Sequence, residues 1–296
     1  MKDKGSPARR ITLLDIALLT AIAAGTAYMA YRAATGLNYH WRWDAVWHYL
    51  FRFDETAGTW RPGLLAEGLI TTLRLSLWAG VLGTVIGTAA GLMRVSPRLL
   101  SRQLAATYVG LIRNTPPLVL IFVFYFFIGD QIMHWLGVDH FTRSLSDETR
   151  AGMSWLFGRM DRFPQFLSAV ITLALIEGAY IAEIVRAGIQ SVERGQWEAA
   201  TALGMGRARA MRHIVLPQAM QRMLPALAGQ FISIIKDSAI VSVISIEELT
   251  FQAQQIMTTT YRSFEIWTTV LVMYFVLTFA CSLAVRRLEV ALAGRG

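Results

Sequence analysis

Long apolar stretches alternate with shorter polar and basic segments along this chain. A helix needs about 20 mostly apolar residues to cross a hydrocarbon core roughly 30 Å thick. Six stretches have about that length. The pattern therefore predicts an all-α fold, a polytopic transmembrane helix bundle of about six spans. The expected spans cover residues 11–31, 64–93, 105–128, 166–186, 223–246 and 264–285.

The first expected span differs from the others in its surroundings. A basic segment precedes it, as in a cleaved signal peptide, and contains Lys2, Lys4, Arg9 and Arg10. The stretch is long for a signal peptide and no convincing cleavage site follows, which favours a retained helix. The aromatic segment after it, with Trp41, Trp43 and Trp47, predicts an interfacial helix or belt. Residues 1–60 are therefore treated as one region and residues 61–290 as the transmembrane domain.

Two of the expected spans contain features that affect how they pack or bend. Gly83, Gly87 and Gly91 recur at every fourth position, and such a row lets another helix approach closely in lipid. The run from Arg113 to Pro117 interrupts the third span, because adjacent prolines remove two amide donors. This break marks either a bend at a cavity mouth or the point where an interfacial helix enters the bilayer. Residues 129–164 are expected to form a polar loop.

Charge placement predicts the orientation of the chain. Hydrophobic residues make up 54% of it and charged residues only 16%, with a net charge of +8. Most basic residues flank the apolar stretches, as topology determinants do, so we do not expect nucleic-acid binding. The N-terminus, residues 94–102, residues 186–222 and the tail carry 16 basic residues, and the opposite side carries nine. This asymmetry predicts that both termini and the segment 187–222 are cytoplasmic.

The cytoplasmic segment reads as a pair of short helices. The first, residues 191–204, ends at Gly204, where glycine can adopt the left-handed conformation that closes a helix. The second carries Met205, Ala208, Met211 and Val215 on one stripe, and Pro217 ends the unit. Such a pair is either a ridge that fits a partner's groove or a surface loop folded against its own bundle.

The residues of this segment resemble the EAA loop of ABC importer permeases. The match consists of Glu198-Ala199-Ala200, then Gly204, and then Ile214, Leu216 and Pro217. Further runs resemble the polar amino acid uptake branch, which includes histidine, glutamine, glutamate and arginine permeases. They are Thr71-Thr-Leu73, Arg113-Asn-Thr-Pro116, Ala179-Tyr-Ile-Ala-Glu-Ile-Val-Arg186, Gly195-Gln-Trp-Glu198, Gln230-Phe-Ile-Ser233, Lys236-Asp237 and Glu248-Leu-Thr250.

The resemblance implies a type I ABC importer core of five spans, with the first helix additional. It implies that a coupling loop, residues 191–220, docks into separate ABC ATPase subunits. The expected coupling residues are Glu198, Ala199, Ala200, Gly204, Arg207, Ile214 and Pro217. It also implies a second permease copy or a homologous permease, an extracytoplasmic amino-acid-binding protein, and the bacterial inner membrane. The loop 129–164 is longer than usual and faces the binding protein, so it either alters that contact or is an inert insertion.

This chain is not expected to hydrolyse ATP. A phosphate-binding loop ends in Gly-Lys-Ser/Thr, and none of the three lysines follows a glycine. No cofactor is therefore expected on this chain, and ATP and Mg would bind the partner ATPase.

Ionisable residues at membrane depth are costly and indicate a pathway. We expect the substrate route to involve Glu177, Lys236, Asp237 and Ser238. An internal ion pair that fixes the bundle is the structural alternative for Lys236 and Asp237. The alternative function is a proton-coupled secondary amino acid carrier that uses Glu177 and Asp237.

Overall fold

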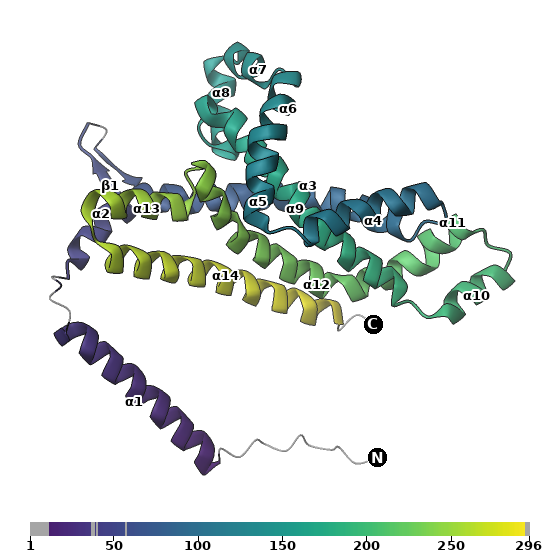
Figure 1. Cartoon of the computed structure of the whole chain (residues 1–296), viewed down its shortest axis with the longest axis horizontal. Coiled ribbons are helices and arrows are strands. Elements are labelled where there is room, and N and C mark those ends of the chain that lie inside the picture. Colours follow the sequence, from purple (N-terminus) through teal and green to yellow (C-terminus); the bar gives the residue numbers. More distant parts are fainter. Residues whose placement is uncertain (1–11, 37–38, 40, 57, 294–296) are drawn as a thin grey trace. The chain divides into compact units, whose positions relative to one another are not determined.

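The computed structural model describes residues 12–36, 39, 41–56 and 58–293, and they divide into two compact units after Trp43. The first unit contains helix α1, Leu13–Gly36 (Figure 1). Thr12 caps this helix, because its hydroxyl oxygen accepts the amide of Asp15 at 3.3 Å while its own amide donates to Asp15 Oδ2 at 2.8 Å. Within α1 the described apolar part is Leu13–Met29. The predicted basic segment with Lys2, Lys4, Arg9 and Arg10 lies outside the described residues, as does Arg295.

The second unit begins with a short helical segment and a hairpin. A 3₁₀ turn, Trp43–Ala45, leads into α2, Val46–Leu50. Strands β1, Phe51–Asp54, and β2, Thr59–Pro62, pair antiparallel with Phe51 opposite Pro62. Exposed aromatic side chains run over this region, including Trp47, Phe53 and Trp60. The predicted interfacial segment is therefore a helix followed by a β-hairpin.

Five helical segments within the described residues are long and apolar enough to cross a membrane. They are α3, Leu64–Arg94; the segment Pro117–Trp135, built from α5 (Pro117–Phe122), a π-helical stretch (Val123–Gly129) and α6 (Asp130–Trp135); α9, Phe163–Gln190; the segment Arg207–Ile244; and α14, Ser263–Ala293. Shorter helices connect them: α4, Leu99–Arg113; α7, Val138–Ser144; α8, Asp147–Phe157; α10, Arg194–Ala202; and α13, Leu249–Thr260. The result is an all-α membrane bundle.

The third predicted span began too early. Helix α4 ends at Arg113, and the apolar spanning segment starts only at Pro117. The two prolines cannot donate to the preceding turn, and Pro117 instead occupies the first turn of α5, where proline is tolerated. Asn114 and Thr115 donate their side chains back to the carbonyls of Gly110 and Leu111, both at 2.8 Å. These bonds close α4 and separate it from the span.

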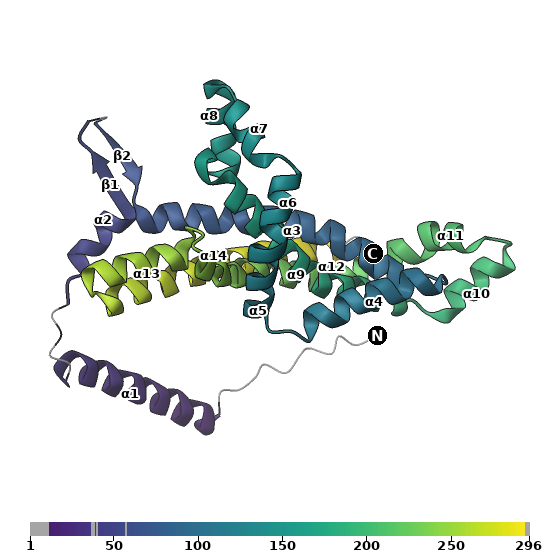
Figure 2. The same ribbon diagram turned by 45° about the horizontal axis from the view of Figure 1, so that its top comes forward.

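The predicted polar loop 129–164 is helical. It contains α6, α7, α8 and a 3₁₀ turn, Met160–Arg162. Ser146 caps α8 by accepting the amide of Thr149 at 3.4 Å. A small apolar cluster formed by Met133, Val138, Met160 and Phe163 holds the segment together. Figure 2 shows α7 and α8 projecting to one side of the long helices.

Helices α3 and α9 form the centre of the second unit through the predicted glycine row. A Cβ atom placed on Gly87 would lie 2.6 Å from Ile181 Cβ, and one on Gly91 would lie 2.6 Å from Val185 Cβ. The missing side chains therefore let the two backbones approach closely. Helix α4 covers the same side of α9, where Tyr108 donates its hydroxyl to the Leu175 carbonyl at 2.6 Å. Burial raises the pKa of Tyr108 to about 12, so the hydroxyl keeps its proton.

A buried carboxylate ties three helices together. Glu248 caps α13 by accepting the amide of Phe251 at 2.8 Å. It also accepts the hydroxyls of Thr72 on α3, at 3.3 Å, and Tyr274 on α14, at 2.8 Å. Burial raises the pKa of Glu248, and these donors act in the opposite direction. Two of the runs that carry the family resemblance, around Thr72 and Glu248, thus contact one another.

Candidate functional site

The predicted coupling segment forms a helix pair at one end of the second unit. Figures 1 and 2 both place α10 and α11, Arg207–Ala210, at the end opposite α2 and the hairpin. Gly204 closes α10 with φ of +71°, as predicted, and no atom lies within 4 Å of a Cβ built on it. The expected first helix is shorter than residues 191–204, because Ser191–Glu193 form a turn before α10.

Most of the predicted coupling residues face outward. Glu198, Ala199, Gly204 and Pro217 are exposed, Ile214 is half-buried and Ala200 is buried. Arg207 is exposed but held, because its guanidinium lies over the Trp197 ring at 5.6 Å and donates to the Val95 carbonyl at 3.3 Å. The segment therefore combines an exposed surface with a fixed internal contact.

Two details of the second helix differ from the prediction. Ala208 is exposed, and Ala210 takes the buried position in its place. The backbone becomes π-helical over Met211–Val215, which shifts the register of the expected stripe. Pro217 does not end the helical unit either. It lies in the first turn of α12, Leu216–Asp237, directly after the π-helical stretch, where its missing amide breaks no regular α-helical bond.

An inner cavity brings together two of the four predicted pathway residues. It has a volume of about 290 Å³, and Glu177 of α9 and Asp237 of α12 both line it, together with Gln230 and Ser233. Glu177 is 1% exposed and accepts a hydrogen bond from Gln230 Nε2 at 2.7 Å. Two carboxyl groups and two neutral polar side chains thus face one small space between helices.

Lys236 and Ser238 do not line this inner cavity. Ser238 is fully buried and donates to the carbonyl of Ile235 at 2.8 Å, in the last turn of α12. Lys236 is exposed on the single chain. The described residues show no ion pair between Lys236 and Asp237, because neighbouring positions on a helix project in different directions.

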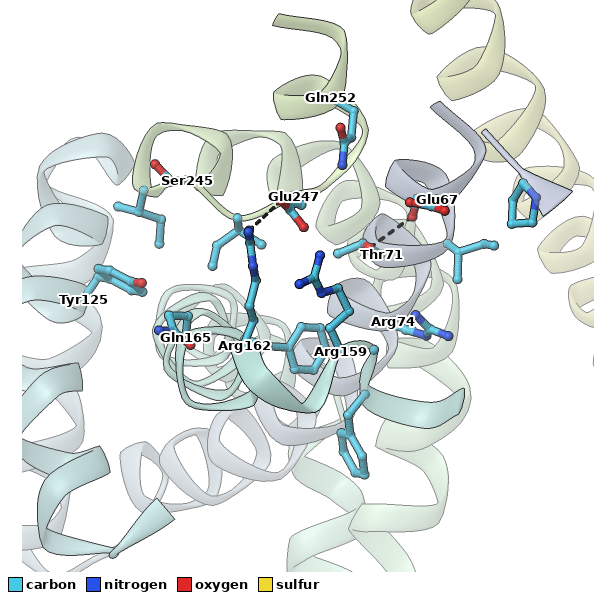
Figure 3. Close-up of a pocket in the computed structure, with 17 residues that line it drawn as sticks. Glu67, Thr71, Arg74, Tyr125, Arg159, Arg162, Gln165, Ser245, Glu247 and Gln252 are labelled. Atoms are coloured by element: carbon cyan, nitrogen blue, oxygen red, sulfur yellow. Dashed lines mark hydrogen bonds and ion pairs between the residues drawn. The ribbon is translucent and has the colours of Figure 1, made fainter. Parts of the chain in front are cut away.

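A second cavity of about 620 Å³, called the outer cavity below, lies where α3, α9 and the segment before α13 meet. Figure 3 shows the side chains that line it, with Arg159 and Arg162 reaching toward its centre. Arg162 forms an ion pair with Glu247 at 2.5 Å across the cavity. Arg74 also lines it, and its Nε donates to the carbonyl of Trp155 at 3.0 Å.

Comparison with known proteins identifies the family to which this chain belongs. The model of a protein family described as "Binding-protein-dependent transport system inner membrane component" matches residues 83–294. The chain belongs to this family of transport permeases. It is 34% identical over 247 residues to the glutamine transport system permease protein of Escherichia coli (strain K12), covering 83% of this chain and 95% of the relative. An octopine transport system permease protein of Rhizobium radiobacter is 35% identical over 229 residues, covering 77% and 85%.

A solved structure agrees with these relatives. The crystal structure of an amino acid ABC transporter with histidines matches the permease with a TM-score of 0.60 and 37% identity, covering 76% of this chain and 92% of that one. The chain is thus a multi-pass permease subunit of a binding-protein-dependent ABC importer. The predicted family and fold are confirmed, and these relatives give no support to the proton-coupled alternative.

The sequence prediction missed the polar lining of the permease's outer cavity. Arg74 lies well inside the span of α3, and its position within an apolar stretch was the available signal. Arg159 and Arg162 offered no such signal, because they belong to a segment expected to be a loop. Packing brings them to Arg74, because Arg162 directly precedes α9, which packs on α3, and the end of α8 also contacts α3. In that contact Trp78 Nε1 donates to the Leu156 carbonyl at 3.3 Å, and its ring stacks on Phe157 at 4.9 Å.

Proposed function

We propose that this permease moves an amino acid that an extracytoplasmic binding protein delivers, using ATP and Mg bound by separate ABC ATPase subunits. The permease pairs with a second copy or a homologous permease in the bacterial inner membrane, with both termini cytoplasmic. Three observations support this: the relatives carry names of glutamine and octopine permeases, 16 basic residues flank the proposed cytoplasmic ends, and no lysine of the chain follows a glycine.

The exposed helix pair α10–α11 is the observation that carries the coupling role. Gly204 gives the sharp turn between its helices, and Arg207 anchors the pair to the α3–α4 connection through the Val95 carbonyl. A partner that pushes on Glu198 and Ala199 therefore pushes on a surface already connected to α3. In this proposal, ATP binding moves the pair, and the movement changes the access to the cavities deeper in the bundle.

A backbone substitution tests the coupling role. Gly204→Val forces a β-branched residue into a left-handed conformation, whereas Gly206→Val is the matched control because Gly206 has φ of −65°. Both sites have open space around a Cβ atom. We expect Gly204→Val to reduce ATPase association and binding-protein-stimulated ATP hydrolysis, and Gly206→Val to leave both near wild type. Normal assembly and stimulation in Gly204→Val would remove the coupling assignment.

The two cavities support a route along α9. The outer one carries three guanidinium groups and two carboxylates, Glu67 and Glu247, and the inner one carries Glu177 and Asp237, so a zwitterion meets a net positive lining and then a negative one. Glu177 is buried with one hydrogen-bond donor and has room beside it. We propose that it selects for the amino group of the substrate, or for a cationic side chain, and that Asp237 assists it. Lys236 and Ser238 would act indirectly, Ser238 by stabilising the end of α12 and Lys236 at the contact with the second permease.

Uptake specificity tests the role of Glu177. Glu177→Gln keeps the shape of the side chain and its contact with Gln230 but removes the charge. We expect it to weaken uptake of cationic amino acids more than uptake of neutral ones in proteoliposomes. Glu183→Gln is the control, since Glu183 pairs with Arg186 and Arg94 away from the inner cavity. Unchanged selectivity and affinity in Glu177→Gln would contradict the proposal.

The segment 129–164 contributes to the same route in this proposal. Its last residues supply Phe157 and Arg159 to the outer cavity, which argues against an inert insertion. The proposed organisation is an N-terminal region, residues 1–60, followed by the transmembrane domain, residues 61–290, which contains the coupling loop 191–220.

A further inference from the structure

A third cavity lies behind the coupling helices and is strongly basic. It has a volume of about 470 Å³ and lies between the α3–α4 connection, the end of α9, and the α10–α11 pair. Four of the residues that line it are arginines, and none is acidic: Arg94, Arg102, Arg194 and Arg207.

The positive charge of this cavity is poorly neutralised. Arg94 pairs with Glu183, but Arg186 contacts the same carboxylate, at 3.1 Å through its Nε, and Arg113 lies 3.8 Å from it. One negative charge is thus shared among three guanidinium groups. The other arginines of the cavity form no ion pair among the described residues. An anion that enters this cavity would meet guanidinium groups that no carboxylate of the cavity lining neutralises.

The cavity is built into the fold. Arg207 is fixed by its contact with Trp197 at 5.6 Å and by its hydrogen bond to the Val95 carbonyl at 3.3 Å. The wall opposite is the first turn of α4, which carries Arg102. An anion held between these walls would join the α3–α4 connection to the coupling helices.

The position of the cavity matches that of a lipid headgroup. With the orientation proposed above, the cavity lies at the cytoplasmic membrane surface, where anionic headgroups are abundant and basic pockets between helices bind them. The exposed leucines of α4, Leu100, Leu104 and Leu111, lie on the face of that helix opposite Arg102 and are not part of the cavity. The excess of arginines over acidic side chains therefore carries the assignment, and it matches the phosphate of an anionic headgroup.

We propose that this cavity binds the phosphate of an anionic phospholipid, with Arg102 and Arg207 holding the headgroup. The lipid would thereby fix the coupling helices to the α3–α4 connection. The site rests on the proposed orientation of the chain but not on the identity of the transported substrate.

The test uses the assembled transporter, permease with its ATPase subunits, in detergent with native mass spectrometry. Phosphatidylglycerol and phosphatidylcholine are titrated in turn. Arg102→Gln removes an exposed charge from the cavity, and Arg98→Gln is the matched control because Arg98 lies one turn away on the same connection and does not line the cavity. One charge at a membrane surface corresponds to about a fivefold change in affinity. We expect wild type and Arg98→Gln to retain phosphatidylglycerol over phosphatidylcholine, and Arg102→Gln to bind it about fivefold more weakly.

Four results would overturn the proposal. Equal retention of both lipids, or equal loss in both variants, would show that the cavity is not an anionic-lipid site. Displacement of phosphatidylglycerol by millimolar inorganic phosphate would assign the cavity to a free phosphate ion. Binding to the permease alone that disappears when the ATPase is added would show that the partner covers these arginines. Lipid binding is measured without transport, so the lipid-binding results would still hold if the proposed substrate were wrong.

Discussion

The contact between α3 and α9 makes a quantitative prediction about Gly87. A Cβ atom on Gly87 would lie 2.6 Å from Ile181 Cβ and 2.7 Å from the Gly178 carbonyl oxygen. Neither obstacle can rotate away, since one belongs to a branched Cβ and the other to backbone. Overpacking of this kind costs about 1–3 kcal/mol, while replacing a helical glycine by alanine returns up to about 1 kcal/mol. We expect Gly87→Ala to lose about 1–2 kcal/mol net.

Two other glycines calibrate this estimate. Gly110 of α4 has no atom within 4 Å of a built Cβ, so Gly110→Ala should be neutral or slightly stabilising. Gly83→Ala should fall between them, because its Cβ would lie 3.3 Å from the Ala174 carbonyl. The assay is the melting temperature of the purified permease in one detergent, where roughly 2–4 °C corresponds to 1 kcal/mol. A Gly87→Ala protein as stable as Gly110→Ala would refute the close approach of α3 and α9.

Two further predictions concern the contacts of Glu248 and Trp78. Glu248→Ala should lower the stability of the permease by about 2 kcal/mol, because it removes the cap of α13 and the buried acceptor of Tyr274. Glu248→Gln keeps an acceptor and should lose less stability in the same melting assay. Equal losses in the two variants would contradict this role of Glu248. Trp78→Ala removes the stack on Phe157 and the bond to the Leu156 carbonyl, so residues 138–157 should be cleaved several-fold faster by limited proteolysis. Trp155→Ala, at a side chain 76% exposed, is the control and should be cleaved at the wild-type rate.

The local pattern of the sequence was sufficient to predict the long apolar helices and the turn at Gly204. Hydrophobic length depends only on composition over about 20 residues, and the left-handed turn depends on a single residue type. The glycine row indicated a close helix contact for the same reason, since a missing side chain has one steric consequence wherever the helix packs. The break at residues 113–117 was also visible, but its position relative to the span depended on the side-chain caps from Asn114 and Thr115.

What only the tertiary structure decided is which distant residues face one another. Glu177 and Asp237 were chosen from the sequence for their depth, but their shared cavity depends on how α9 and α12 are rotated, and the same rotation excludes Ser238. Arg74 and Arg162 line one cavity because α9, which Arg162 directly precedes, packs on α3. Hydrophobic periodicity assigns a residue to a helix and to its depth in the membrane. Which residue of another helix it contacts is set by the packing between helices, and the spacing of residues along the sequence carries no information about that packing.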